Sequence, residues 1–143
     1  MHWIKNISFY IVAALSLNVL SVFLVSSFLS KFLHDNVINI LINLLAINTA
    51  STGIVLTKLK EISERHNDFD FSEIFIELKL ALVEQIVLIG LSIIVLIFND
   101  SNLIKANLSQ HEFIFNTLIT AIFINALDTL RDTGKAIFLI IKK

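Results

Sequence analysis

The stretch of sequence that decides the fold lies at residues 36–57 and reads NVINILINLLAINTASTGIVLT. It contains 22 residues and no charged side chain. A membrane-spanning helix needs only about 20 such residues at roughly 1.5 Å of rise each. An uncharged run of 25 residues precedes it at residues 6–30. We therefore interpret the chain as an integral membrane protein, in contact with the lipid bilayer over most of its length.

Two weaker apolar stretches follow the first two. Residues 80–98 contain one ionisable side chain, Glu84, and residues 113–127 are apolar with polar edges. Only helices and closed barrels satisfy their backbone polar groups inside lipid. The sequence therefore predicts an all-α fold, a single membrane domain over residues 1–143 with four transmembrane helices. We place the spans at about residues 6–30, 36–57, 80–98 and 112–133, each close to the length a bilayer requires.

The last two spans are preceded by helix-start signals. Asp70 and Glu73 have the spacing of a capping box, and so do Ser109 and Glu112. In such a box the first side chain accepts a hydrogen bond from a free backbone N–H, and the acid three residues later reaches back. We expect each helix to begin one residue after its cap.

The third helix is then longer than the bilayer is thick. We expect the second and third helices to continue beyond the membrane as a hairpin over residues 58–79 that turns at Asn67 and Asp68. Gly134 is the expected end of the fourth helix, because glycine is frequent just after the last helical residue. The remaining tail, residues 134–143, is too short to span and is expected at the membrane interface.

The positive charges predict the orientation. Nine of the 11 Lys and Arg side chains precede the first span, lie between the second and third, or follow the last apolar stretch at residues 113–127. Lys31 and Lys105 are the two exceptions. Short loops rich in Lys and Arg stay on the cytoplasmic side. The sequence therefore predicts that both termini and the hairpin lie in the cytoplasm.

The composition argues against an enzyme. The chain has no cysteine, so disulfides and thiolate chemistry are excluded. It contains no glycine-rich phosphate loop, no metal-binding helix motif and no nucleophile elbow. We expect no cofactor, no metal and no direct binding of nucleic acid, although the net charge of −1 by itself predicts nothing about nucleic acid.

Small and polar residues recur along residues 36–57 at alternating steps of three and four. We call this set the asparagine stripe: Asn36, Asn39, Asn43, Ala46, Ala50, Gly53 and Thr57. Helices in lipid associate through small side chains and through amides that bond across the contact. Three interpretations stay open: packing against helices of the same chain, an interface between subunits of a homo-oligomer, and the lining of a narrow water-filled path.

Glu84 and Gln85 are polar residues inside an apolar stretch. An ionisable group at membrane depth suggests proton relay or a counter-charge for a substrate. Glu84 lies only about one turn inside the expected span, however, where a carboxylate can reach interfacial water. We favour this second interpretation, in which the carboxylate reaches interfacial water or pairs with Lys58 or Lys60 of the neighbouring helix.

Other polar groups predict packing or solvated ends. Short stripes occur on the first and fourth spans, at Ala14, Asn18 and Ser21 and at Thr117, Ala121 and Asn125. Such faces indicate helix packing. Four charges at helical spacing follow the apolar stretch at residues 113–127, and we expect them to pair with one another at a solvated helix end: Asp128, Arg131, Asp132 and Lys135.

The hairpin combines aromatic and acidic side chains. Phe69, Phe71, Glu73, Phe75 and Glu77 would form a surface just below the membrane, suited to docking a cytoplasmic protein. Packing within the hairpin and against lipid headgroups is the alternative.

A protein with four spans and almost no external mass is expected to act by assembly. We hypothesise a homo-oligomeric scaffold or sensor that docks a cytoplasmic partner; the alternative is a pore-forming or depolarising, holin-like effector.

In overall plan the chain resembles the small four-span membrane subunits of bacterial anti-phage systems, and is most similar to the membrane subunit of the Kiwa system. The likeness rests on the layout, with four spans, the charged segment from Lys58 to Lys79 and no attached catalytic domain. The resemblance implies a homotetramer in the bacterial inner membrane that senses phage attack and binds a soluble DNA-binding effector. It assigns no role to any single residue.

Overall fold

A computed structural model of the chain describes residues 2–65, 72–107 and 110–141, with side chains over 7–64, 74–106 and 110–135. Every regular element in these residues is a helix, which confirms the predicted all-α class. The elements in chain order are α1 (His2–Phe23), α2 (Phe28–Arg65), α3 (Ser72–Asp100), α4 (Asn102–Asn107) and α5 (His111–Ile141).

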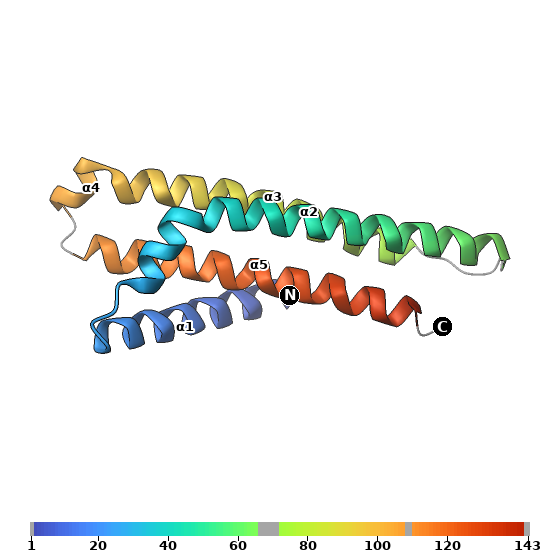
Figure 1. Cartoon of the computed structure of the whole chain (residues 1–143), viewed down its shortest axis with the longest axis horizontal. Helices are drawn as coiled ribbons and strands as arrows, with labels where there is room; N and C mark the ends of the chain where they lie inside the picture. The colour runs from blue at the N-terminus through green and yellow to red at the C-terminus, as the bar shows by residue number, and fades with distance from the viewer. Residues whose placement is uncertain (1, 66–71, 108–109, 142–143) are drawn as a thin grey trace.

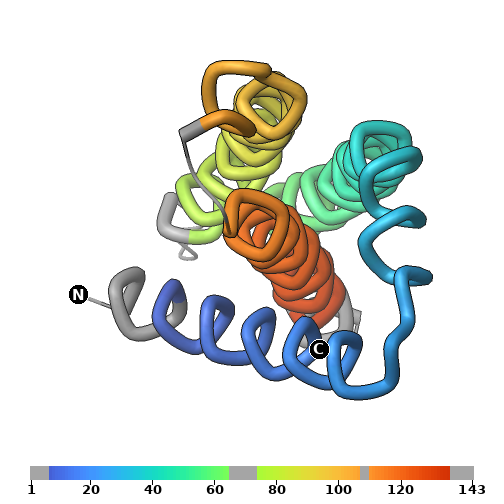
Figure 2. Tube along the Cα trace, turned by 90° about the vertical axis from the view of Figure 1, so that its left-hand side faces the viewer, coloured from blue at the N-terminus to red at the C-terminus, as the bar shows by residue number. Residues whose placement is uncertain are grey.

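The four long helices form a bundle with α5 at its centre. Helix α5 contacts α1, α2 and α3, whereas α1 packs chiefly on α5 (Figures 1 and 2). Helices α2 and α3 lie side by side and run in opposite directions. The α1–α2 turn and α4 lie together at one end of the bundle, which we call the α4 end (Figure 1).

At the opposite end, α2 extends farther than the other helices, and α3 begins beside it. We call this the hairpin end (Figure 1). Helix α2 has 38 residues and α3 has 29, which correspond to lengths of about 57 and 44 Å. The expected turn at Asn67 and Asp68 lies outside the described residues.

Three helices are long and apolar enough to cross a membrane: Phe28–Glu64, Ile74–Asp100 and His111–Lys135. Helix α1 contributes a shorter apolar segment, Ile7–Phe23. Large apolar side chains face outward along the bundle, among them Phe9, Leu80 and Ile97, which are each at least 60% exposed. Exposing such a surface to water would be unfavourable in free energy, so the bundle has the exterior of a membrane protein.

The first apolar run is divided by a turn, which corrects the predicted span at residues 6–30. Helix α1 ends at Phe23 and α2 begins at Phe28, well before the expected residue 36. Val25 has a φ of 51°, its N–H bonds to Val22 O at 3.0 Å, and Ser26 N–H bonds to Ser21 O at 2.9 Å. These two bonds are those of a Schellman helix end. The prediction was wrong because no charge, proline or glycine marks the turn.

Helix α5 continues through Gly134 to Ile141, so the prediction that the helix ends at Gly134 is wrong. A glycine inside a helix costs only about 0.5–1 kcal/mol relative to alanine, which neighbouring helical turns can offset. The start of α3 at Ser72 and of α5 at His111 agree with the predicted starts to within one residue. The caps Asp70 and Ser109 lie outside the described residues.

Two separate apolar clusters hold the bundle together. The larger joins α2, α3 and α5 through Leu33, Val37, Leu41, Leu44, Leu88, Ile119 and Ala126. The smaller joins α2 and α3 nearer the hairpin end through Val55, Leu59 and Leu78. Helix α1 supplies no residue to either cluster within the part of the chain that the structure describes.

Candidate functional site

The asparagine stripe faces away from the rest of the chain. Asn39, Asn43, Ala46, Ala50, Gly53 and Thr57 are all exposed, and Asn36 is partly buried. The buried positions of α2 are instead Leu33, Val37, Leu41, Leu44, Asn48, Thr52, Val55 and Leu59. At 3.6 residues per turn, the centres of these two sets lie roughly 180° apart around the helix. Packing within one chain therefore does not account for the stripe.

Among the described residues, the outward amides bond to nothing outside their own helix. Asn36 donates from Nδ2 to Phe32 O at 2.9 Å, within its own helix. Among the described residues, the side chains of Asn39 and Asn43 form no hydrogen bond. In a bilayer each would meet acyl chains, where an unpaired amide costs several kcal/mol. The stripe is thus a polar face in an otherwise apolar exterior.

The part of the stripe nearer the hairpin end is open to close approach by another helix. A Cβ atom built on Gly53 meets no other atom within 4 Å. Thr57 Oγ1 donates to Gly53 O at 3.0 Å, so its hydroxyl is satisfied by its own helix. With Ala46 and Ala50 exposed on the same side, the α2 surface here is shallow. Shallow faces of this kind let two backbones come close in lipid.

One asparagine of α2 points inward, and the sequence did not reveal it. Asn48 is fully buried, and Thr52 one turn later is also buried. Gln85 of α3, predicted as an intramembrane polar residue, is 1% exposed. Neither amide atom of Asn48 or Gln85 has a hydrogen-bond partner within the described residues. The only signal available was the offset of Asn48 from the periodicity of the stripe.

Helix α1 docks on α5 through the short polar faces, which confirms their predicted role in packing. Ala14 and Asn18 are buried. Asn18 Nδ2 donates to Ala14 O at 3.1 Å, and it lies 3.4 Å from both Thr117 Oγ1 and Thr120 Oγ1. These contacts place polar side chains between helices, where lipid cannot reach them.

Glu84 does not pair with the lysines of α2. Lys58 pairs with Glu61 at 2.7 Å, and Lys60 lies 4.0 Å from Glu64. Glu84 is partly buried, and the side chain of Asn125 on α5 lies close enough to interact with its carboxylate. Of the two interfacial contacts expected for Glu84, the pairing with Lys58 or Lys60 is wrong, because each lysine pairs with an acid one turn along its own helix.

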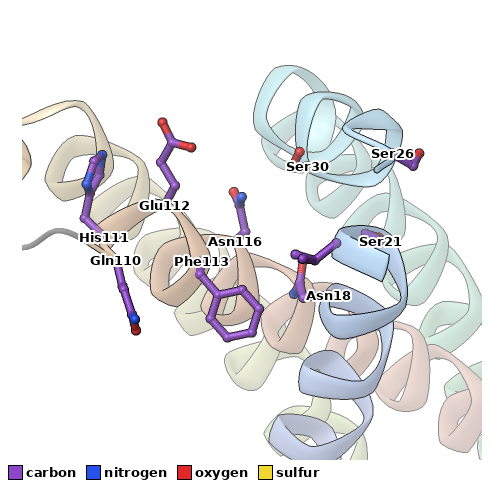
Figure 3. A pocket seen from close by; sticks show the side chains of 10 residues that line it. Asn18, Ser21, Ser26, Ser30, Gln110, His111, Glu112, Phe113 and Asn116 are labelled. Atoms are coloured by element: carbon purple, nitrogen blue, oxygen red, sulfur yellow. The ribbon is translucent and has the colours of Figure 1, made fainter. Parts of the chain in front are cut away.

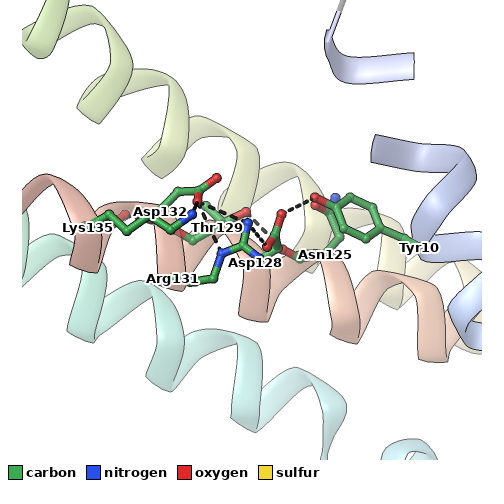
Figure 4. A network of polar contacts seen from close by, with 8 residues as sticks. Tyr10, Asn125, Asp128, Thr129, Arg131, Asp132 and Lys135 are labelled. Carbon is green, nitrogen blue, oxygen red and sulfur yellow. Dashed lines mark hydrogen bonds and ion pairs between the residues drawn. The ribbon is translucent and has the colours of Figure 1, made fainter. Parts of the chain in front are cut away.

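The charges of α5 pair with one another as predicted, but they are not all solvated (Figure 4). Arg131 bonds to Asp128 at 2.6 Å, and Lys135 bonds to Asp132 at 2.9 Å. Tyr10 of α1 donates its hydroxyl to Asp128 Oδ2 at 2.6 Å. The Asp128 side chain is only 16% exposed. This network ties α1 to α5 on the hairpin side of Asn18.

Two open polar pockets lie at the α4 end. One, of about 530 Å³, lies between α1 and α5, and Asn18, Ser21, His111 and Asn116 are among its lining residues (Figure 3). The other, of about 360 Å³, brings His34, Asp35, His111 and Glu112 together with Lys31, Asp100 and Lys105. No group of three or more His, Asp or Glu in the described residues has the geometry to hold a metal ion.

The predicted docking surface is described only in part. Phe69 and Phe71 lie outside the described residues, as does the side chain of Glu73. Phe75 is 48% exposed, and Glu77 is also exposed. Ile74 instead packs against the smaller apolar cluster. The described part of the hairpin end thus presents Phe75 and Glu77 on its surface.

Comparison of the chain with protein-family models, with curated proteins and with solved structures finds no match.

Proposed function

We propose that the chain is a subunit of a homo-oligomeric membrane scaffold or sensor, assembled through the asparagine stripe of α2. The observation that carries the proposal is the direction of the stripe. Six of its seven residues are exposed, on the opposite side of α2 from the packed face. The occupant that best matches this face is a second copy of the same stripe.

Self-association would remove the polar atoms from lipid. Asn39 and Asn43 each carry a donor and an acceptor, so the amides of two copies can bond to one another. Ala46, Ala50 and Gly53 would let the helices approach closely in the same contact. Positions repeating every 3.5 residues favour a left-handed crossing near about 20°. A tetramer is the assembly that the likeness to the Kiwa membrane subunit implies.

The partner of such a scaffold would dock at the hairpin end. The excess of Lys and Arg supports a cytoplasmic hairpin, with both termini on the same side and α1 as a fourth span. Phe75 is a half-exposed aromatic residue beside Glu77, a combination suited to a protein partner. By the same resemblance, this partner is a soluble effector and the setting is antiviral defence at the bacterial inner membrane.

A pore-forming effector remains the second candidate, because the same amides would line a path if subunits met as a ring. The larger apolar cluster closes the interior of one chain toward the α4 end, so any path would run between chains. Conductance or dye leakage in vesicles that is lost in Asn43→Leu, with the subunit number unchanged, favours this function over the scaffold.

Native mass spectrometry of the purified protein tests the assembly. We expect an oligomer for the unaltered chain and a shift to monomer in Gly53→Leu, because the leucine would fill the contact between stripes. Gly90→Leu on α3 is the matched control, since the Cβ position of Gly90 is also open within the chain. A monomer in the unaltered protein, or equal oligomers in both variants, would contradict the proposal.

Docking is tested separately with the purified products of adjacent genes. We expect Phe75→Glu to abolish co-purification of a partner and Phe75→Leu to retain it, because only the first places a charge on the apolar contact. Both variants should keep the oligomeric state of the unaltered protein. Retained binding in Phe75→Glu would show that Phe75 is not part of the docking surface. It would not contradict the proposed assembly through α2.

A further inference from the structure

The two buried amides lie in a gap between the apolar clusters. On α2 the larger cluster ends at Leu44 and the smaller begins at Val55, and Asn48 and Thr52 occupy the buried positions between them. On α3 the smaller cluster holds Leu78 and the larger Leu88. Gln85 is the buried polar residue between these two leucines. The amides therefore lie at the same level of the bundle.

Helix α5 carries buried hydroxyl groups just beyond the larger cluster, on the side toward the hairpin end. Thr129 and Thr133 are buried one and two turns beyond Ala126 on the same face of α5. Thr129 donates to Asn125 O and Thr133 to Thr129 O, both at 3.1 Å. Their hydroxyl hydrogens are thus engaged, while each oxygen retains the capacity to accept a bond. We call Asn48, Thr52, Gln85, Thr129 and Thr133 the polar layer.

The polar layer has more hydrogen-bonding capacity than the chain satisfies. Asn48 is 0% and Gln85 1% exposed, and all four of their amide heavy atoms lack a partner within the described residues. Each amide supplies two N–H donors and an oxygen with two lone pairs. Leaving such groups dry inside a membrane bundle would cost several kcal/mol apiece. An occupant that both donates and accepts is needed, and water is the smallest.

We propose that the polar layer is an internal water-binding site, with Asn48 and Gln85 as its principal ligands. Buried waters typically make about three hydrogen bonds to groups of this kind. The amides supply donors and acceptors from α2 and α3, and the threonine oxygens of α5 supply further acceptors. The layer is then a hydrated level that separates the apolar core of the α4 end from that of the hairpin end.

The larger apolar cluster determines the side from which water reaches the layer. It fills the core between the layer and the α4 end. Toward the hairpin end the buried face of α5 is polar at Thr133, and exposed Lys135 follows. Water therefore exchanges with the layer along α5 from the hairpin end. This property belongs to a single chain and does not depend on the oligomer.

Solid-state NMR of the labelled protein in lipid tests the site by measuring magnetisation transfer from water. We expect transfer to the side-chain amide nitrogens of Asn48 and Gln85 to be several-fold faster than to the methyl groups of Leu44 and Leu88. These leucines are buried beside the layer and serve as internal controls. Equal, slow transfer at all four residues would show a dry layer and overturn the proposal.

A double variant tests whether the amides hold the water. In Asn48→Leu/Gln85→Leu we expect transfer to the side chains of Thr129 and Thr133 to fall several-fold relative to the unaltered protein. Unchanged transfer would mean that water reaches α5 without these ligands, which also overturns the proposal. If the double variant does not fold, the comparison within the unaltered protein decides by itself.

Discussion

Val25 holds a backbone conformation that β-branched residues rarely adopt. Its φ of 51° lies in the left-handed region, where the Cβ of an L-residue crowds the neighbouring carbonyl. Its side chain is 93% exposed, so no packing within the chain offsets the strain. The conformation is maintained by the paired backbone bonds that end α1. The α1–α2 turn is therefore a strained link between two apolar helices.

Replacing Val25 by glycine should relieve this strain. We expect Val25→Gly to raise the free energy of unfolding by up to about 1 kcal/mol, since a gain of about 1–2 kcal/mol in the folded state is offset partly by glycine's greater freedom when unfolded. Denaturant titration in mixed micelles measures the change. Val22→Gly, within α1 and also exposed, is the control and should be destabilising. Destabilisation in both variants would show that the turn is not strained at Val25.

At the scale of the helix, patterns in the sequence predicted where helices begin better than they predicted which side of a helix is buried. Helix α3 begins where its capping signals place it, because those signals act locally. The direction of the asparagine stripe was not predictable from α2 alone, since Asn39, Asn43 and Asn48 have the same chemistry. The offset of Asn48 from the stripe does not indicate which face of the helix is buried. The turn before Phe28 was missed because an uncharged run gives length without indicating where the backbone reverses.

The continuity of α5 through Gly134 leads to a prediction about that helix. A Cβ added to Gly134 meets nothing within 4 Å, so alanine fits without a clash. We expect Gly134→Ala to stabilise the protein by about 0.5–1 kcal/mol, because alanine loses less backbone freedom in a helix. Gly90→Ala, inside α3 and equally open, should give a similar gain in the same titration. A loss confined to Gly134→Ala would place a break in α5 at this residue.

At the scale of the whole molecule, α1 is attached differently from the other helices. Helices α2, α3 and α5 share the larger apolar cluster, whereas α1 is joined to α5 by Tyr10 and Asn18 and by the close contact at Ala14. Hydrogen bonds between helices in lipid average only about 0.6 kcal/mol each. A helix held by a few such bonds can open without unfolding the rest. The bundle is thus a three-helix core with α1 as a peripheral element.

Hydrogen–deuterium exchange tests this division of the molecule. We expect Tyr10→Phe to speed exchange along α1 and to leave α2 and α3 unchanged, because the variant removes the bond to Asp128 and no contact of the core. With a loss of about 1.5 kcal/mol for a bond to a charged group, local opening should become roughly ten times more frequent. Ser16→Ala is the matched control on α1, since Ser16 bonds only to Val12 O of its own helix. Faster exchange throughout the bundle in Tyr10→Phe would mean that α1 and the core open as one cooperative unit.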